Sequence, residues 1–223
     1  MSSLLIRNGT IVTATDRYQA DVYIEGELIS MIGASLDVSA DREIDASGCY
    51  LFPGGIDAHT HMELPFMGTH ASDTFESGTL AGLHGGTTTI VDFAIQTQGD
   101  SLEAAINTWH EKADGHAVGD YAFHCAVTDF NENTRKELPT VINEHGINSF
   151  KIFMAYKGAL MIDDRQMYEL MQELVELGGI VTAHTENGDM IDSNIQRNLA
   201  AGNTAPKYHV LSRPAICEAE AAG

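Results

Sequence analysis

From residue 53 onward, short β-branched or apolar runs alternate with amphipathic stretches of helical period. The runs that predict strands lie at 56–58, 87–93, 121–127, 147–155 and 180–183. The stretches that predict helices lie at 77–83, 101–113, 134–142, 163–178 and 187–201. This alternation predicts a parallel sheet with helices packed outside it. An open doubly wound sheet and an eight-stranded barrel both fit, and about five strand–helix units are too few to close a barrel.

The opening of the chain has a different pattern. Short apolar runs flank two expected tight turns, at Asn8-Gly9 and Glu25-Gly26, and further short strands are expected at 42–44 and 50–52. The pattern changes at 53–55, which reads Pro-Gly-Gly. The sequence therefore predicts a small β domain over residues 1–52 and the first part of a larger α/β domain over residues 53–223.

Charge and cysteine content restrict the classes of partner. Asp and Glu outnumber Lys and Arg by 32 to 12, a net charge of -20, which disfavours binding to nucleic acid or to an anionic membrane surface. The three cysteines are widely spaced, which fits a reducing compartment. No signal peptide and no apolar run of membrane-spanning length is recognisable. These features predict a soluble cytoplasmic protein.

Polar residues at the predicted strand ends are the candidates for chemistry, because catalytic groups of α/β folds gather at the carboxyl ends of parallel strands. His59 and His61 follow the first strand and are two residues apart, so both side chains point to the same face. Two neutral imidazoles on one face suit a divalent metal ion. Among ten histidines, however, such a pair also arises by chance.

Lys151 lies inside an apolar strand, Ser149 to Ala155. A lysine in such a strand usually points outward or reaches the surface with its ammonium group. The alternative is an amine that has lost its proton and reacted with carbon dioxide. The resulting carbamate has two oxygens, can bridge two metal ions, and would have its charge neutralised by them.

Three further strand-end residues need an interpretation. His184 ends the run 180–184, which is apolar up to this histidine and polar after it, and it is a candidate metal ligand. Asp92 and His124 also lie at strand ends and are interpreted as structural.

Two helix starts carry expected caps: Asp100 with Glu103 for one, and Asp163 or Asp164 for another.

Four segments in order, PGGIDAHTHMELPF, GGTTTIVDF, SFKIFMAYKG and VTAHTENGDMI, resemble the dihydropyrimidinase/hydantoinase branch of the amidohydrolase superfamily. The likeness runs along nearly the whole chain, and KIFMAYKG is its most discriminating segment. It implies a TIM-like (β/α)8 barrel beside a small β-sandwich that is built from both chain ends. Homotetramers are common among members of this branch, so the resemblance also predicts a homo-oligomer.

The resemblance assigns roles to matching residues. It implies two zinc ions per subunit, the first held by His59 and His61, the second by His184, and both bridged by carboxylated Lys151. Tyr156 matches a tyrosine that hydrogen-bonds the substrate carbonyl and stabilises the oxyanion. The apolar side chains of the loop 62–66, Leu64 among them, and of Phe153 are expected either to line the substrate pocket or to pack as plain core.

One departure from the family pattern affects the expected site. The resemblance implies a histidine on a sixth strand and an aspartate on an eighth, and no residue after His184 fits either role. His209 is interpreted as a loop residue. The expectation is therefore a partial chain, a site completed by another polypeptide, or an inactive protein.

The implied activity is metal-dependent hydrolysis of the ring amide of cyclic ureides, namely 5,6-dihydropyrimidines and hydantoins, to N-carbamoyl amino acids. One alternative is a dihydropyrimidinase-like assembly protein without catalysis. The intact set of His59, His61, Lys151 and His184 favours an enzyme over that alternative. Another is an allantoinase or a related cyclic-amide hydrolase, and a third is a fragment without independent function.

Overall fold

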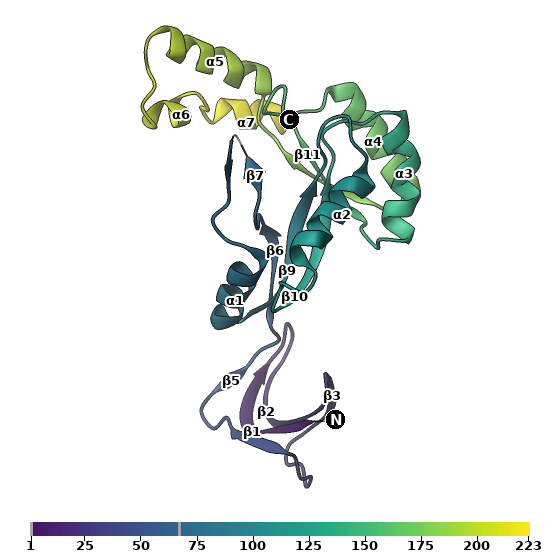
Figure 1. The fold of residues 1–223 in the computed structure, drawn as a ribbon. Helices are drawn as coiled ribbons and strands as arrows, with labels where there is room; N and C mark the ends of the chain where they lie inside the picture. The colour runs from purple at the N-terminus through teal and green to yellow at the C-terminus, as the bar shows by residue number, and fades with distance from the viewer. Residues whose placement is uncertain (1, 67) are drawn as a thin grey trace. The chain divides into compact units, whose positions relative to one another are not determined.

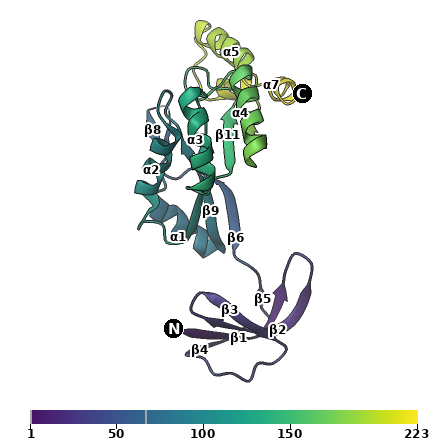
Figure 2. The same ribbon diagram turned by 90° about the vertical axis from the view of Figure 1, so that its right-hand side faces the viewer.

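The computed structural model describes residues 2–66 and 68–223 (Figures 1 and 2). The chain divides into two compact units, Met1–Gly55 and Ile56–Gly223. The exact extents of the two predicted domains stay a prediction.

The first unit is one mixed five-stranded sheet, in the order β3-β2-β1-β4 with β5 also paired to β1. Its strands are β1 (Ser3–Val12), β2 (Arg17–Glu25), β3 (Leu28–Gly33), β4 (Arg42–Asp45) and β5 (Tyr50–Leu51). β1 and β2 are antiparallel, as are β2 and β3, whereas β4 and β5 run parallel to β1. Ile11, Ala20 and Val22 form the small core of this unit.

Of the two turns predicted for this unit, one prediction is confirmed and the other is wrong. The Glu25-Gly26 turn joins β2 to β3 as predicted, but Asn8-Gly9 lies inside β1, where the register to β2 shifts. Asn8 takes a left-handed φ of 61°. Its backbone N–H donates to Asp21 Oδ1 at 2.9 Å. The pair therefore makes a β-bulge, which uses the same backbone freedom as a turn.

The second unit is built on a five-stranded sheet in the order β12-β11-β10-β9-β6. The pairs β9/β10, β10/β11 and β11/β12 are all parallel. The strands of the sheet are β6 (Gly55–Thr60), β9 (Thr87–Ile95), β10 (Asp120–Ala126), β11 (Ser149–Phe153) and β12 (Ile180–His184). The second unit also contains a small hairpin, formed by β7 (Pro65–Phe66) and β8 (Thr69–His70). β6 and β12 are the two edges of the large sheet.

Helices alternate with these strands, as the periodicity predicts (Figure 2). They are α1 (Phe75–Gly85), α2 (Leu102–Ala113), α3 (Glu132–Asn143), α4 (Asp164–Leu177), α5 (Gly188–Ala200), α6 (Lys207–Leu211) and α7 (Ile216–Ala221). Within the described ranges, no helix combines the length and the apolar character needed to cross a bilayer.

The helix caps refine the expected starts. Asp163 caps α4 as predicted, and its side chain accepts from the backbone N–H of Gln166. The cap of α2 is Ser101 rather than Asp100 with Glu103, because the Ser101 side chain accepts from Ala104 N at 3.0 Å. The interpretation of His209 as a loop residue is also wrong, since it lies in α6.

The core of the second unit lies between the sheet and helices α1 to α4. Its fully buried large side chains include Phe75, Leu102, Ile106, Leu138, Phe150, Ile152, Leu170 and Leu174. Burying each such side chain stabilises the fold by about 1.5–3 kcal/mol. This packing fixes the strands in place, so the residues that follow their carboxyl ends are held on a rigid support.

Candidate metal centre

His59 lies in the edge strand β6 and His61 directly follows its last residue, and their imidazole rings meet edge to face at 85°. The ring centroids are 5.2 Å apart. Phe93, on the neighbouring strand β9, contacts both rings. Its ring centroid lies 4.7 Å from that of His59 and 5.0 Å from that of His61. Thr60 between them is buried, as expected when alternate side chains point to opposite faces. The structure thus brings the predicted histidine pair together on one face.

One ring nitrogen of His61 is buried and has no hydrogen-bond partner among the described residues. Among the described residues, its Nδ1 is the one buried side-chain polar atom without a hydrogen bond. Burial lowers the pKa of His61 below its ordinary value, and the positive charges of His59 and Lys151 lower it further, while Asp92 opposes them. A neutral imidazole with a free nitrogen is the form that binds a metal ion.

Lys151 lies inside β11, and its side chain is largely buried, with the residue 8% exposed. No hydrogen bond or ion pair in the described part of the chain involves its Nζ, which lies 5.2 Å from the ring centroid of Phe153. Burial lowers the pKa of this amine below its ordinary value. Burial without an anionic partner disfavours the charged ammonium, so this amine loses its proton more readily than that of an exposed lysine.

His184 ends β12, at the other edge of the sheet, and its ring is held by a carboxylate. Its Nε2 lies 2.6 Å from Glu186 Oε2. Glu186 in turn lies 3.6 Å from Arg213 Nε. A carboxylate on one ring nitrogen fixes the tautomer and leaves the other nitrogen, Nδ1, free to bind. Glu186 was not predicted, although it follows the histidine by two residues in the same polar segment.

Tyr156 follows β11 and adopts a left-handed φ of 66°, which is uncommon for a bulky residue. Its carbonyl oxygen accepts from the backbone N–H groups of Ala159 and Leu160, both at 3.0 Å. This turn directs the ring toward His184, with the two ring centroids 5.3 Å apart. Arg213 lies over the same ring, 5.7 Å from its centroid.

The two residues expected to contact substrate differ in their surroundings. Phe153 is buried, with its ring centroid 6.0 Å from those of both Tyr156 and His184. Leu64 lines a separate cleft of about 430 Å³ together with Pro65 and Leu160. None of the four predicted metal ligands lines that cleft. The structure therefore places Phe153 beside the candidate centre and Leu64 beside a neighbouring hollow.

Asp92 and His124 have structural partners. Asp92 is 1% exposed and accepts hydrogen bonds from Thr60, Met62 and Trp109. The imidazole of His124 lies 2.7 Å from Ser149 Oγ and 3.0 Å from the carbonyl oxygen of Ala58. These contacts agree with the structural interpretation of both residues.

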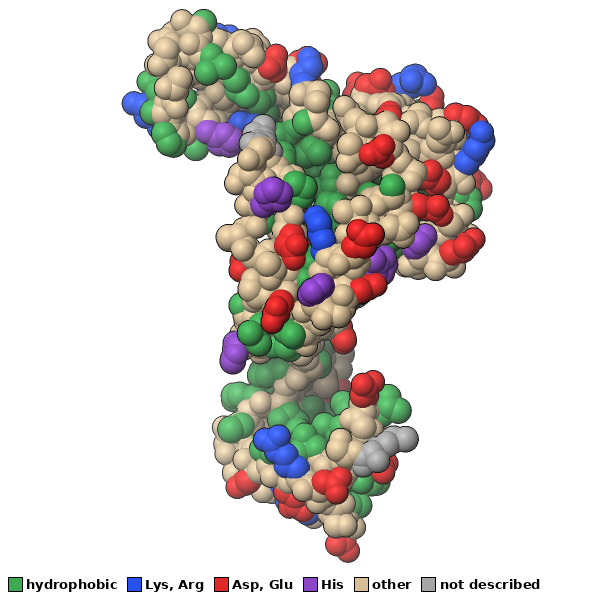
Figure 3. All heavy atoms as spheres, viewed as in Figure 1, with side chains coloured by type: hydrophobic (Ala, Val, Ile, Leu, Met, Phe, Trp, Pro, Cys, Tyr) green, Lys and Arg blue, Asp and Glu red, His purple; other side chains and the backbone are tan. Residues whose placement is uncertain are grey.

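The candidate centre thus consists of the His59/His61 pair at the β6 edge of the sheet, His184 at the β12 edge, and Lys151 on β11 between these edges. In the part of the chain that the structure describes, no three His, Cys, Asp or Glu side chains form a group able to hold a metal ion. The donor types nevertheless fit zinc, which binds imidazole nitrogen and carboxylate-like oxygen. On the face shown in Figure 3, acidic side chains are spread over the surface and basic ones are scattered.

Comparison with known proteins assigns the class. Residues 50–215 match the amidohydrolase family, and the chain belongs to that family. Its relatives include a D-hydantoinase of Geobacillus stearothermophilus, 52% identical over 98% of this chain and 46% of the relative. They also include a dihydropyrimidinase of Rattus norvegicus, 44% identical over 98% of this chain and 43% of the relative. The chain spans about half the length of the curated relatives it matches.

A solved structure supports the same assignment. The dihydropyrimidinase from Brevibacillus agri NCHU1002 superimposes with a TM-score of 0.96 at 52% identity, covering 98% of this chain and 48% of that one. The predicted fold class is confirmed, because the parallel sheet of the second unit forms part of a TIM-like barrel and the first unit is a separate small sheet. The predicted resemblance to dihydropyrimidinases and hydantoinases is confirmed as well.

Proposed function

We propose that this chain is part of a metal-dependent hydrolase that opens the ring amide of cyclic ureides. It would supply the metal ligands that lie at the ends of β6 and β12 and within β11. The substrates are 5,6-dihydropyrimidines or hydantoins, and the products are N-carbamoyl amino acids. The names of the relatives support this substrate class, since they are D-hydantoinases and dihydropyrimidinases. The protein is proposed to be cytoplasmic and homotetrameric.

The single observation that carries the proposal is Lys151, whose side chain is largely buried and whose Nζ has no anionic partner among the described residues. A neutral amine can take up carbon dioxide, and its carbamate presents two oxygens as metal ligands. His59 and His61 would hold one zinc ion and His184 the other, with carboxylated Lys151 shared between them. The free Nδ1 of His61 supports this arrangement, because it is buried and lacks a hydrogen-bond partner.

Zinc, when bound, polarises a carbonyl group and makes water nucleophilic at neutral pH. The chain's own residues would then orient the substrate and its developing charge. The Tyr156 hydroxyl would donate to the substrate carbonyl oxygen as negative charge develops there. Phe153, packed beside Tyr156, would offer an apolar wall to the ring substituent, and Leu64 would contact the substrate from the neighbouring cleft that it lines.

Metal content and turnover of the natively expressed protein test this function. We expect about two zinc ions per subunit and hydrolysis of dihydrouracil or hydantoin, with an N-carbamoyl amino acid as product. Lys151→Met is the matched variant, because it keeps a long apolar side chain but cannot form a carbamate. It should lose both metal and turnover while keeping the fold by circular dichroism.

Other outcomes point to the alternatives. Turnover of allantoin without turnover of dihydrouracil or hydantoin would replace the proposed substrate class. A correctly folded protein with neither metal nor turnover would contradict the hydrolase proposal and favour a role in assembly.

A further inference from the structure

Asp92 is a buried carboxylate on β9, and each of its oxygens has its own pair of donors. Oδ2 accepts from Thr60 Oγ1 at 2.8 Å and from Met62 N at 2.7 Å. Oδ1 accepts from Trp109 Nε1 at 2.9 Å and from the adjacent Phe93 N at 2.8 Å. Four hydrogen bonds therefore satisfy both oxygens of a side chain that is 1% exposed.

The two donors on Oδ2 flank His61 in the sequence. One comes from a side chain that points away from the histidine rings, and the other from the backbone immediately after His61. The carboxylate therefore holds the His59-Thr60-His61 segment from the side opposite to its imidazoles. Phe93, the next residue of β9, packs against both imidazoles on the other side.

Two consecutive residues of β9 thus contact the histidine segment from its two faces. Asp92 fixes the backbone through hydrogen bonds, and Phe93 limits the rotation of the rings. Met62 is also lodged against α1, where a Cβ on Gly78 would lie 2.3 Å from its sulfur. Glycine at position 78 leaves room for Met62 in this conformation.

We propose that Asp92 is a positioning residue that sets the geometry of His59 and His61 for metal binding through its Oδ2 contacts. The inference rests on the proposed function, since it needs a metal ion at this histidine pair. Asp92 touches neither metal nor substrate in this scheme. It acts through the backbone of the ligand segment, a role typical of groups behind metal ligands.

The alternative is that Asp92 only ties β6, β9 and α2 together. The two oxygens separate these roles, because Oδ2 serves the ligand segment and Oδ1 serves Trp109 on α2. Thr60→Val removes one donor from Oδ2 with little change in shape. Trp109→Phe removes one donor from Oδ1 and is the matched control.

The experiment measures zinc affinity of the natively expressed protein by competition with a chromophoric chelator, alongside urea unfolding of each apoprotein. The absorption spectrum of the Co²⁺-substituted protein reports the ligand geometry. Thr60→Val should weaken binding at the His59/His61 side by roughly 10- to 100-fold and change the Co²⁺ spectrum. Thr60→Ser keeps the hydroxyl donor and should restore both. Trp109→Phe should lower stability but leave affinity and spectrum unchanged.

Two results would overturn the inference in distinguishable ways. If the unmodified protein binds no metal, the proposed function fails and the positioning role fails with it. If the unmodified protein binds metal, but Thr60→Val and Trp109→Phe change affinity equally, Asp92 is only a structural link and the proposed function stands. If the Asp92→Asn protein folds, its zinc affinity extends the test. If it does not fold, the comparison of Thr60→Val with Trp109→Phe decides between the two roles of Asp92.

Discussion

The two sides of the candidate centre use a carboxylate in different ways. On the β6 side, Asp92 binds behind the ligand segment and leaves the buried Nδ1 of His61 without a partner. On the β12 side, Glu186 binds the ring of His184 directly, and Arg213 approaches the same carboxylate. The first arrangement orders a backbone, whereas the second orders one imidazole and selects its tautomer.

Burial differs between the two sides as well. Asp92 is almost wholly buried, while the side chains of His184 and Glu186 are 33% and 17% exposed. Charge interactions near solvent are weakened by salt and by water more than buried hydrogen bonds are. The β6 side should therefore keep its geometry over a wider range of conditions than the β12 side.

The largest expected effect comes from Tyr156, which belongs to the β12 side through its contact with His184. Tyr156→Phe keeps the ring and its packing but removes the hydroxyl donor. Turnover number should fall by about 10²- to 10³-fold, the usual effect of losing one oxyanion donor. Zinc content, measured by mass spectrometry of the metal, should not change. An unaltered turnover number would remove Tyr156 from the chemistry.

Glu186→Ala tests whether the ring-bound carboxylate supports metal binding. It leaves His184 without an orienting partner, so zinc affinity on the β12 side should fall by roughly 10- to 100-fold. Chelator competition measures this loss, and Glu186→Gln should retain part of the affinity because its amide can still hydrogen-bond the ring. Glu176→Ala, an exposed glutamate on α4, is the control. Equal affinities for the two alanine variants would contradict the role given to Glu186.

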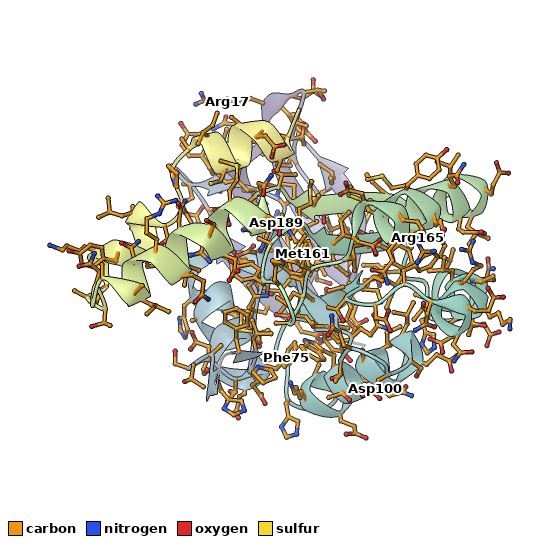
Figure 4. All side chains as sticks on the ribbon, turned by 90° about the horizontal axis from the view of Figure 1, so that it is seen from above. Arg17, Phe75, Asp100, Met161, Arg165 and Asp189 are labelled. Atoms are coloured by element: carbon orange, nitrogen blue, oxygen red, sulfur yellow. The ribbon has the colours of Figure 1, made fainter. Side chains whose placement is uncertain are left out.

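Gly188→Ala should disturb the β12 side alone. Gly188 starts α5, donates its N–H to Met154 O at 3.1 Å, and would place a Cβ only 2.9 Å from that oxygen. The sulfur of Met161 would lie 2.8 Å from the same Cβ, and Figure 4 labels this methionine together with Asp189 of α5. Overpacking here should cost about 1–3 kcal/mol of unfolding free energy.

The control for this prediction is Gly85→Ala on α1, where a Cβ would meet nothing within 4 Å. Urea unfolding compares the two variants. A Gly188→Ala protein as stable as Gly85→Ala would show that the helix start can shift without loss.

The smallest expected effect is a dependence of apoprotein stability on pH. Burial lowers the pKa of His61 below its ordinary value. As pH falls below 6.5, the unfolded chain therefore takes up a proton on this histidine before the folded chain does. Stability must fall over that interval, and level off once the folded form is also protonated.

His61→Asn should flatten this part of the stability curve, because its side chain does not titrate. Urea midpoints of the two metal-free proteins between pH 7 and pH 5 measure the difference, a range set about the ordinary histidine pKa. Parallel curves would mean that His61 is solvated in the apoprotein.

Much of the scaffold follows from local patterns. The alternation of strands and helices, the cap at Asp163 and the shared face of His59 and His61 each depend on a period or a short motif. These features could be predicted because neighbouring residues determine them. The burial of Lys151 could not, because the apolar strand around it fits both an outward-pointing and a buried side chain.

The remaining features depend on contacts between distant segments. Asp92 meets Thr60 and Trp109 across 32 and 17 residues, and only the register of β9 with its neighbours decides this. Tyr156 has a left-handed backbone that its residue type does not favour. Asn8-Gly9 was expected to form a turn, yet Asp21 on the paired strand converts the same motif into a bulge.

Trp109 is the one tryptophan in this sequence, and it donates its indole N–H to the carboxylate behind the histidine pair. The ammonium of Lys112 lies 4.0 Å from the centroid of its ring. Indole emission is sensitive to nearby charge and hydrogen bonding, so the chain carries its own fluorescent reporter. We expect metal binding at the histidine pair to change this emission, which a titration of the unlabelled protein would measure.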